Sequence, residues 1–119
     1  MKFKYFTYGE FDSPDFLGSG KLVSDELISM LDVARKKYGK SMAINSGYRT
    51  IEHNAAVGGK PESSHLKGLA VDIACNNSTD RFKLESILRE VGFKRIGIAK
   101  TFIHADIDKD KAQNVLWTY

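Results

Sequence analysis

The strongest hydrophobic pattern in the chain predicts a helix over residues 24–39. Apolar side chains recur along it at helical spacing: Leu27, Ile28, Leu31, Ala34 and Tyr38. The hydroxyl of Ser24 can cap the start of this helix, and Gly39 can end it. A second apolar stripe, formed by Phe82, Leu84, Ile87, Leu88 and Val91, predicts another helix, which Asp80 caps and Gly92 closes.

Shorter apolar runs predict β-strands. They lie at residues 42–45, 69–74, 95–99 and 101–108. A tight connection joins the last two runs, which favours antiparallel pairing between them. The whole pattern predicts an α+β fold in which a small, mostly antiparallel sheet packs with helices. Because 119 residues give room for one core, we expect residues 1–119 to form a single domain.

The segments between these runs have weaker patterns. Residues 3–20 contain clusters of turn residues, so we expect an irregular arm there. Aromatic side chains are expected to pin this arm to the body of the protein: Phe3, Tyr5, Phe6, Phe11 and Phe16. Residues 52–57 predict a short helix, residues 61–64 a loop, and residues 109–114 a last helical turn before an apolar run at 115–117.

The composition is that of a mildly basic folded protein. Apolar residues make up 42% of the chain, the net charge is +3, and the sequence pI is about 9.0. The lysines are scattered, so we expect no nucleic acid partner. The single cysteine, Cys75, can form no internal disulfide and is predicted to be a buried thiol. Because no apolar signal core follows Met1, we expect a protein made in the cytoplasm without membrane insertion.

Polar residues in and beside the predicted strands indicate a metal site. Asp72 lies inside an apolar run, where a carboxylate needs either a cation or hydrogen-bond donors. Taken alone, a salt bridge or a capping role would explain it equally well. His104 and Asp106 share one face of the later strand, and His65 lies in the loop before the earlier one, where Gly68 lets the chain fold closely. Two histidines and one carboxylate can hold a zinc ion with a fourth position open, the ligand set of a hydrolytic site.

Four motifs occur in order along the chain. They are Asn45-Ser46-Gly47-Tyr48-Arg49-Thr50, Ser63-x-His65-x-x-Gly68-x-Ala70-x-Asp72, Gly97-Ile98 and Phe102-Ile103-His104-x-Asp106. Together they resemble the zinc D-Ala-D-Ala carboxypeptidase family, which includes L-alanyl-D-glutamate endopeptidases and phage endolysins and shares its fold with the hedgehog signalling domain. The resemblance extends from about Phe11 to Asp108 and is greatest to the small phage and bacterial wall peptidases. It implies one zinc ion bound by His65, Asp72 and His104.

The resemblance also implies roles for residues around the metal. Arg49 is expected to point into the site, where it would stabilise an oxyanion or grip a substrate carboxylate; a structural salt bridge is the alternative. Ser63 is expected to bind substrate or to cap its loop. Tyr48 is expected to line the cleft or to pack beneath it.

The general base departs from the family pattern. Many members have an acidic residue three positions before the last zinc histidine, where this chain has Thr101. We therefore predict that Asp106 is the catalytic base, and its alternative role is to orient a ligand histidine. Glu62, near His65 in the loop, is the next candidate.

These residues predict a zinc metallopeptidase that hydrolyses peptidoglycan stem peptides or cross-links at bonds involving D-amino acids. It would be a D,D-carboxypeptidase or an endopeptidase, active as a monomer on the cell wall after release by a holin or delivery by a phage particle. The alternative is a non-catalytic zinc module that binds a wall or protein partner, which the absence of an acid at Thr101 would explain. Lys60 and Lys67 flank the first zinc motif, where they either attract anionic peptides or are simply solvated.

Overall fold

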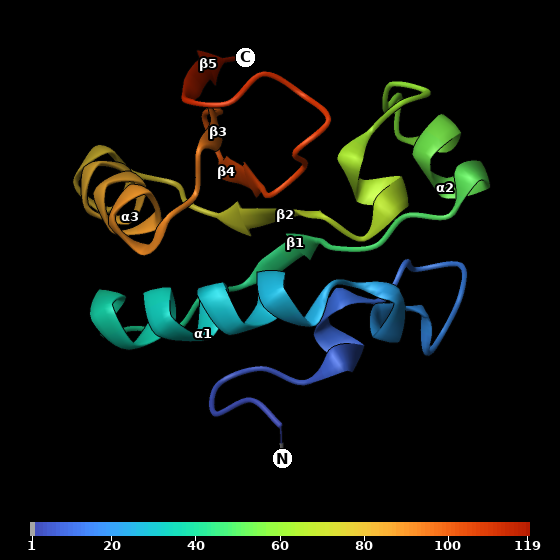
Figure 1. Cartoon of the computed structure of the whole chain (residues 1–119), viewed down its shortest axis with the longest axis horizontal. Coiled ribbons are helices and arrows are strands. Elements are labelled where there is room, and N and C mark those ends of the chain that lie inside the picture. Colours follow the sequence, from blue (N-terminus) through green and yellow to red (C-terminus); the bar gives the residue numbers. More distant parts are fainter. Residues whose placement is uncertain (1) are drawn as a thin grey trace.

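The computed structural model describes residues 2–119 and contains a five-stranded sheet in the order β1-β2-β4-β3-β5 (Figure 1). The helices and strands are α1 (Asp25–Tyr38), β1 (Ile44–Ser46), α2 (Ile51–Ala56), β2 (Ala70–Ala74), α3 (Ser78–Val91), β3 (Arg95–Ile98), β4 (Phe102–Asp106) and β5 (Val115–Thr118). Short 3-10 helices are present at Tyr8–Phe11, Ser19–Leu22 and Ser64–Lys67.

Most strand pairs in the sheet are antiparallel. β2 pairs antiparallel with β1 and with β4, and β4 pairs antiparallel with β3. The edge strand β5 pairs with β3 in the parallel direction. The predicted α+β fold, and the antiparallel pairing of the runs at 95–99 and 101–108, are therefore confirmed.

The hydrophobic core lies between the two long helices and one face of the sheet. α1 begins at the Ser24 cap and ends at Gly39, which has a left-handed φ of 77°. The buried stripes of α1 and α3 meet aliphatic side chains of the strands: Val71, Ile73, Ile96, Ile103 and Ala105. Because side chains alternate along a strand, Asp72 and His104 point to the opposite face of the sheet.

Two details predicted for α3 were wrong. Asn77, not Asp80, caps the helix, because the Asn77 side chain accepts a hydrogen bond of 2.9 Å from the backbone N–H of Asp80. Phe82 is 83% exposed instead of facing inward. Each helical residue turns by about 100°, so Phe82 lies on nearly the opposite side of the helix from Leu84, which is fully buried.

The N-terminal arm packs along α1, as Figure 1 shows for the dark blue segment. Phe3, Phe6 and Phe11 are buried, and the backbone N–H groups of Lys4 and Tyr5 donate hydrogen bonds to the Asp32 carboxylate. The prediction that Phe16 pins the arm was wrong. Its side chain is 53% exposed, because Phe16 closes a small turn with Ser13 at the surface.

The segment before β5 also differs from its prediction. Residues 109–114 form turns and bends, not a helical turn. Arg95 donates a hydrogen bond of 2.7 Å to the carbonyl of Ala112, and Asn114 has a φ of 62°, which a right-handed helix does not allow.

Cys75 is buried, as predicted. Within residues 2–119, no helix combines the length and apolar character needed to cross a bilayer.

Candidate metal centre

The register of the sheet aligns four positions in one row across the strands. Asp72 on β2 lies opposite His104 on β4, His104 lies opposite Gly97 on β3, and Gly97 lies opposite Trp117 on β5. Side chains in such a row share one face of the sheet. Asp72 and His104 are therefore direct neighbours, and Trp117 reaches toward them across a glycine.

His65 approaches this row from the loop after α2. It lies on the 3-10 helix Ser64–Lys67, which the Ser63 side chain caps by accepting a hydrogen bond from the backbone N–H of His65. Gly68 ends this helix with a φ of 71°, and a Cβ there would lie 2.2 Å from the carbonyl oxygen of Leu22. Only glycine fits this turn, so Gly68 is needed to set the position of His65.

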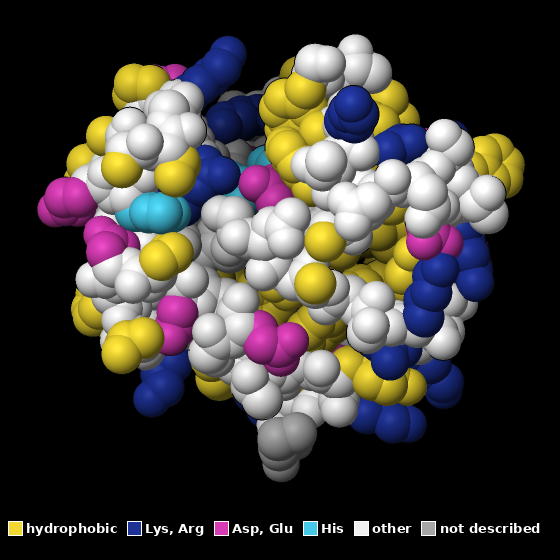
Figure 2. Space-filling model, turned by 180° about the vertical axis from the view of Figure 1, so that it is seen from behind, with side chains coloured by type: hydrophobic (Ala, Val, Ile, Leu, Met, Phe, Trp, Pro, Cys, Tyr) yellow, Lys and Arg dark blue, Asp and Glu magenta, His cyan; other side chains and the backbone are white. Residues whose placement is uncertain are grey.

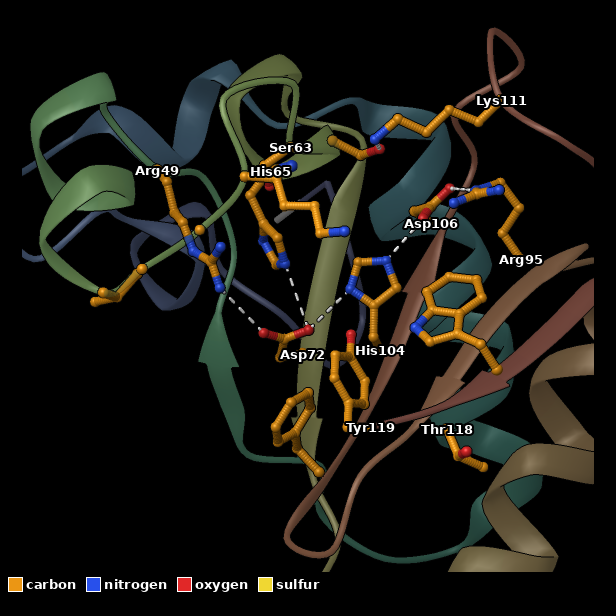
Figure 3. Close-up of a pocket in the computed structure, with 17 residues that line it drawn as sticks. Arg49, Ser63, His65, Asp72, Arg95, His104, Asp106, Lys111, Thr118 and Tyr119 are labelled. Atoms are coloured by element: carbon orange, nitrogen blue, oxygen red, sulfur yellow. Dashed lines mark hydrogen bonds and ion pairs between the residues drawn. The ribbon is translucent and has the colours of Figure 1, made fainter.

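The three predicted ligands converge on one point. His65 Nε2 lies 3.4 Å and His104 Nδ1 lies 3.0 Å from Oδ1 of Asp72, and the three atoms lie within 4.8 Å of one another. All three side chains are buried, and Figure 3 shows both imidazole rings turned toward the Asp72 carboxylate. Burial alone would raise the pKa of Asp72, but hydrogen bonds from His104 and His65 outweigh it and hold this pKa well below its usual range.

The second ring nitrogen of each histidine, the one that points away from Asp72, has its own hydrogen-bond partner. His65 Nδ1 lies 2.8 Å from the carbonyl oxygen of Gly47, and His104 Nε2 lies 2.7 Å from Oδ2 of Asp106. A neutral imidazole that donates its N–H outward presents its other nitrogen as a lone pair. Both rings in this form would offer these lone pairs, together with Oδ1 of Asp72, to an ion bound between them. Two nitrogens and one carboxylate oxygen, aimed at a common point, fit a divalent ion such as zinc.

Asp106 lies on the far side of the His104 ring from Asp72. Its carboxylate is 1% exposed, and each oxygen is already bound. Oδ1 accepts hydrogen bonds from Arg95 Nε at 2.8 Å and from the backbone N–H of Asp108 at 3.1 Å, while Oδ2 faces His104. This placement favours the orienting role of Asp106 over the role of a base.

Arg49 forms a salt bridge with Asp72, the predicted alternative, and also faces the cleft. Its guanidinium donates to Asp72 Oδ2 at 3.3 Å, to Ser46 Oγ at 3.0 Å and to Asn54 Oδ1 at 3.2 Å, and the same side chain lines the cleft. A guanidinium has five N–H donors, so donors remain for a substrate. Tyr48, in contrast, packs against the hydrophobic core.

The cluster lies at the floor of an open cleft of about 620 Å³. Figure 2 shows the hollow from outside, with histidine inside it and Lys and Arg side chains around it. Ser63 lines this cleft, whereas Glu62 lines a neighbouring hollow. Several lining residues were missed from sequence: Arg95, Lys111, Trp117 and Tyr119. The signal for Trp117 was the apolar run at 115–117, but the partner strand of this run could not be predicted from periodicity.

A buried cluster of two histidines and one aspartate, open to a cleft, is typical of the site of a hydrolytic metalloenzyme. The family model described as Peptidase M15 matches residues 4–106, and the chain therefore belongs to this family. M15 peptidases are zinc-dependent, so the class of the protein is a metallopeptidase with a possible zinc site at His65, Asp72 and His104. Curated protein sequences gave no match.

Proposed function

We propose that the protein is a zinc-dependent peptidase that hydrolyses peptidoglycan stem peptides or cross-links at bonds involving D-amino acids. The observation that carries the proposal is the convergence of His65 Nε2, Asp72 Oδ1 and His104 Nδ1 at the floor of a cleft, in a member of a peptidase family. The cleft is open along the surface, which suits an extended peptide.

His65, Asp72 and His104 would hold the zinc ion. When bound, the ion would supply Lewis-acid activation of water and of the scissile carbonyl. The chain contributes the geometry. Gly47 and Asp106 would each accept the outward N–H of one histidine, which leaves the inward nitrogen for the ion, and Asp72 stays ionised to add negative charge to the ligand set.

Arg49 is the proposed electrophilic residue. Its guanidinium lies beside the Asp72 carboxylate and is 14% exposed to the cleft. The contacts with Ser46, Asn54 and Asp72 fix its plane, so its free N–H groups are directed before a substrate arrives. A fixed donor of this kind stabilises negative charge that develops on a carbonyl oxygen, because it needs no reorganisation during the reaction.

Within residues 2–119, the carboxylates that line the cleft are Asp72 and Asp106, and both are held by arginines. For Asp106 to act as a base, it would have to give up one of its three hydrogen bonds. Thr101, at the position of the family acid, is exposed at the start of β4 and does not line the cleft among the described residues. This arrangement is the observation that favours a non-catalytic zinc module as the second candidate.

A digest of purified peptidoglycan tests the proposal. The zinc-loaded protein is incubated with several wall chemotypes, and the soluble products are identified by mass spectrometry. His104→Ala is the inactive variant, and His53→Ala, which changes the histidine outside the cluster, is the matched control.

We expect the same new fragments from the wild-type protein and from His53→Ala, and none from His104→Ala. Release of a single terminal residue would identify a carboxypeptidase, and separation of two peptides an endopeptidase. If zinc-loaded wild-type protein releases nothing from any wall type, the non-catalytic module becomes the better reading.

A further inference from the structure

The charges lining the cleft do not balance. Among the described residues, the cationic side chains that line it are Arg49, Lys60, Arg95 and Lys111, against two carboxylates. Arg49 pairs with Asp72, and Arg95 pairs with Asp106. Neither lysine pairs with a carboxylate of the lining, so the cleft lining carries an excess of positive charge even before a metal ion is counted. Such a cleft attracts anionic groups.

Lys111 is the lysine that the fold holds in place. Its Nζ donates hydrogen bonds of 2.9 Å to the carbonyl oxygen of Glu62 and 2.9 Å to Oγ of Ser64. An ammonium group has three N–H donors, so one is left for a ligand. The side chain is 31% exposed, and Figure 3 shows it at the edge of the cleft.

The buried carboxylate of Asp108 holds the side chains at this edge of the cleft in place. Asp108 is fully buried and accepts hydrogen bonds from Ser64 Oγ at 2.7 Å and from Lys67 Nζ at 3.1 Å. Burial alone would raise the pKa of Asp108, but these hydrogen bonds hold it below its usual range. Lys67 takes Asp108 and Asp110 as partners, whereas Lys111 lies 3.8 Å from Asp108. The charge of Lys111 is therefore the less compensated of the two.

Ser63 adds a second donor at the same edge. Its Oγ accepts a hydrogen bond from the backbone N–H of His65, which leaves the hydroxyl hydrogen available among the contacts of the described residues. Ser63 and Lys111 both line the cleft. Lys111 Nζ also contacts both chain neighbours of Ser63, at the Glu62 carbonyl and the Ser64 hydroxyl. An ammonium and a hydroxyl at one edge of the cleft can donate to the two oxygens of a carboxylate.

We propose that Lys111 and Ser63 form a subsite that binds a carboxylate of the substrate peptide, so that the enzyme prefers peptides with a free carboxylate near the scissile bond. Lys111 lies outside residues 4–106, the segment that the family model matches, so the ammonium of this subsite comes from the chain beyond the family match, whereas Ser63 lies within it. The proposal rests on the proposed peptidase function. The carboxylate is either the C-terminus of the peptide or the carboxyl of an internal acidic residue.

The test uses three synthetic stem peptides: a free acid, its C-terminal amide, and a version with only the internal carboxyl amidated. KM and kcat are measured for the zinc-loaded wild-type protein, for Lys111→Met and for Lys67→Met. Both lysines contact Asp108, but only Lys111 lines the main cleft, so Lys67→Met controls for loss of a charge and for any loss of stability.

We expect the wild-type protein to favour the free acid over one of the amides by roughly tenfold to a hundredfold in KM, the range for a hydrogen bond to a charged group. The amide whose KM rises identifies which carboxylate of the peptide binds to the subsite. Lys111→Met should remove the preference by raising KM for the acid alone, and Lys67→Met should keep it. Retention of the preference in Lys111→Met, or its equal loss in both variants, would overturn the subsite.

Inactivity is a separate outcome. If no peptide is cleaved by the wild-type protein, the proposed peptidase function fails, and the same peptides are then titrated calorimetrically against the three zinc-loaded proteins. Tighter binding of the free acid, lost only in Lys111→Met, would retain the subsite in a binding module. Equal binding of acid and amides would reject it.

Discussion

The two histidines of the cluster are oriented by chemically different acceptors. His65 faces the neutral backbone carbonyl of Gly47, and His104 faces the ionisable side chain of Asp106. A backbone carbonyl can only accept, so it permits one tautomer of His65. The tautomer of His104 depends instead on what occupies position 106, which makes Asp106 the residue where a single substitution can change the ligand set.

We predict that Asp106→Asn lowers zinc affinity by about 10–100-fold, the usual effect of removing a partner of a ligand histidine. Asp106 accepts hydrogen bonds from Arg95, Asp108 and His104. An asparagine amide must turn its NH2 group either toward the donors on one side or toward His104, where it favours the tautomer with a proton on the metal-binding nitrogen. Competition with a fluorescent chelator measures the affinity.

Asp110→Asn is the matched control, because Asp110 is an exposed aspartate of the same segment. It should bind zinc as the wild-type protein does. If Asp106→Asn kept wild-type affinity and lost about 10²–10⁴-fold in turnover, Asp106 would be the base after all.

At the scale of single residues, the sequence was most informative about the candidate ligands. Period-two alternation placed His104 and Asp106 on one face of a strand, and the cost of burying a carboxylate singled out Asp72. The side chains that bind to these residues could not be predicted from the sequence. Arg95 reaches Asp106 only because β3 and β4 pair in one register, and a one-residue shift would have turned it to the other face.

Among the elements, β5 lines the cleft with Trp117 and Thr118. It joins β3 in the parallel direction and sets Trp117 directly opposite Gly97. The indole lies against the backbone of Gly97 so closely that a Cβ at this glycine would lie 2.5 Å from Trp117 Nε1. The ring also packs against His104, with 5.4 Å between ring centroids, and beneath the guanidinium of Arg95.

Gly97→Ala should therefore lower the free energy of unfolding by about 1–3 kcal/mol, the cost of inserting a methyl group into a packed contact. Urea denaturation followed by circular dichroism measures the change. Gly9→Ala is the control, since a Cβ at Gly9 meets nothing within 4 Å. Equal midpoints for the two variants would mean that Trp117 does not pack on β3 in solution.

The elements also show where sequence patterns are sufficient. The stripe and caps of α1 are local, and the helix was predicted to within a residue. In α3 the stripe was correct, but Phe82 was assigned to it because it is apolar, although its angular position faces solvent. The parallel pairing of β5 depends on a loop whose course is set by contacts from Arg95, Lys67 and Lys111, which no local pattern contains.

Across the whole molecule, the proposed metal ligands come from three separate segments. His65 lies in the loop after α2, Asp72 on β2 and His104 on β4, so an ion at this point would tie together parts of the chain that are far apart in sequence. The unfolded chain holds no such geometry. Zinc binding should therefore stabilise the folded state through mass action.

We predict that chelation of zinc lowers the melting temperature by about 10 °C, relative to protein at a free zinc concentration about 100 times Kd. Differential scanning calorimetry with and without a chelator measures this shift. His104→Ala should show little or no change on chelation, because it has lost one ligand of the cluster. A wild-type protein that melts at the same temperature in both conditions would argue against a metal at this site.

The position of Trp117 has a practical consequence. It is the only tryptophan in the chain, and its indole packs on the ring of His104, a proposed metal ligand. Excited indole is sensitive to the charge and protonation of a neighbouring imidazole, so filling the site should alter the intensity of its emission without any label. The protein therefore carries a built-in optical probe of metal occupancy, with no second indole to obscure the signal.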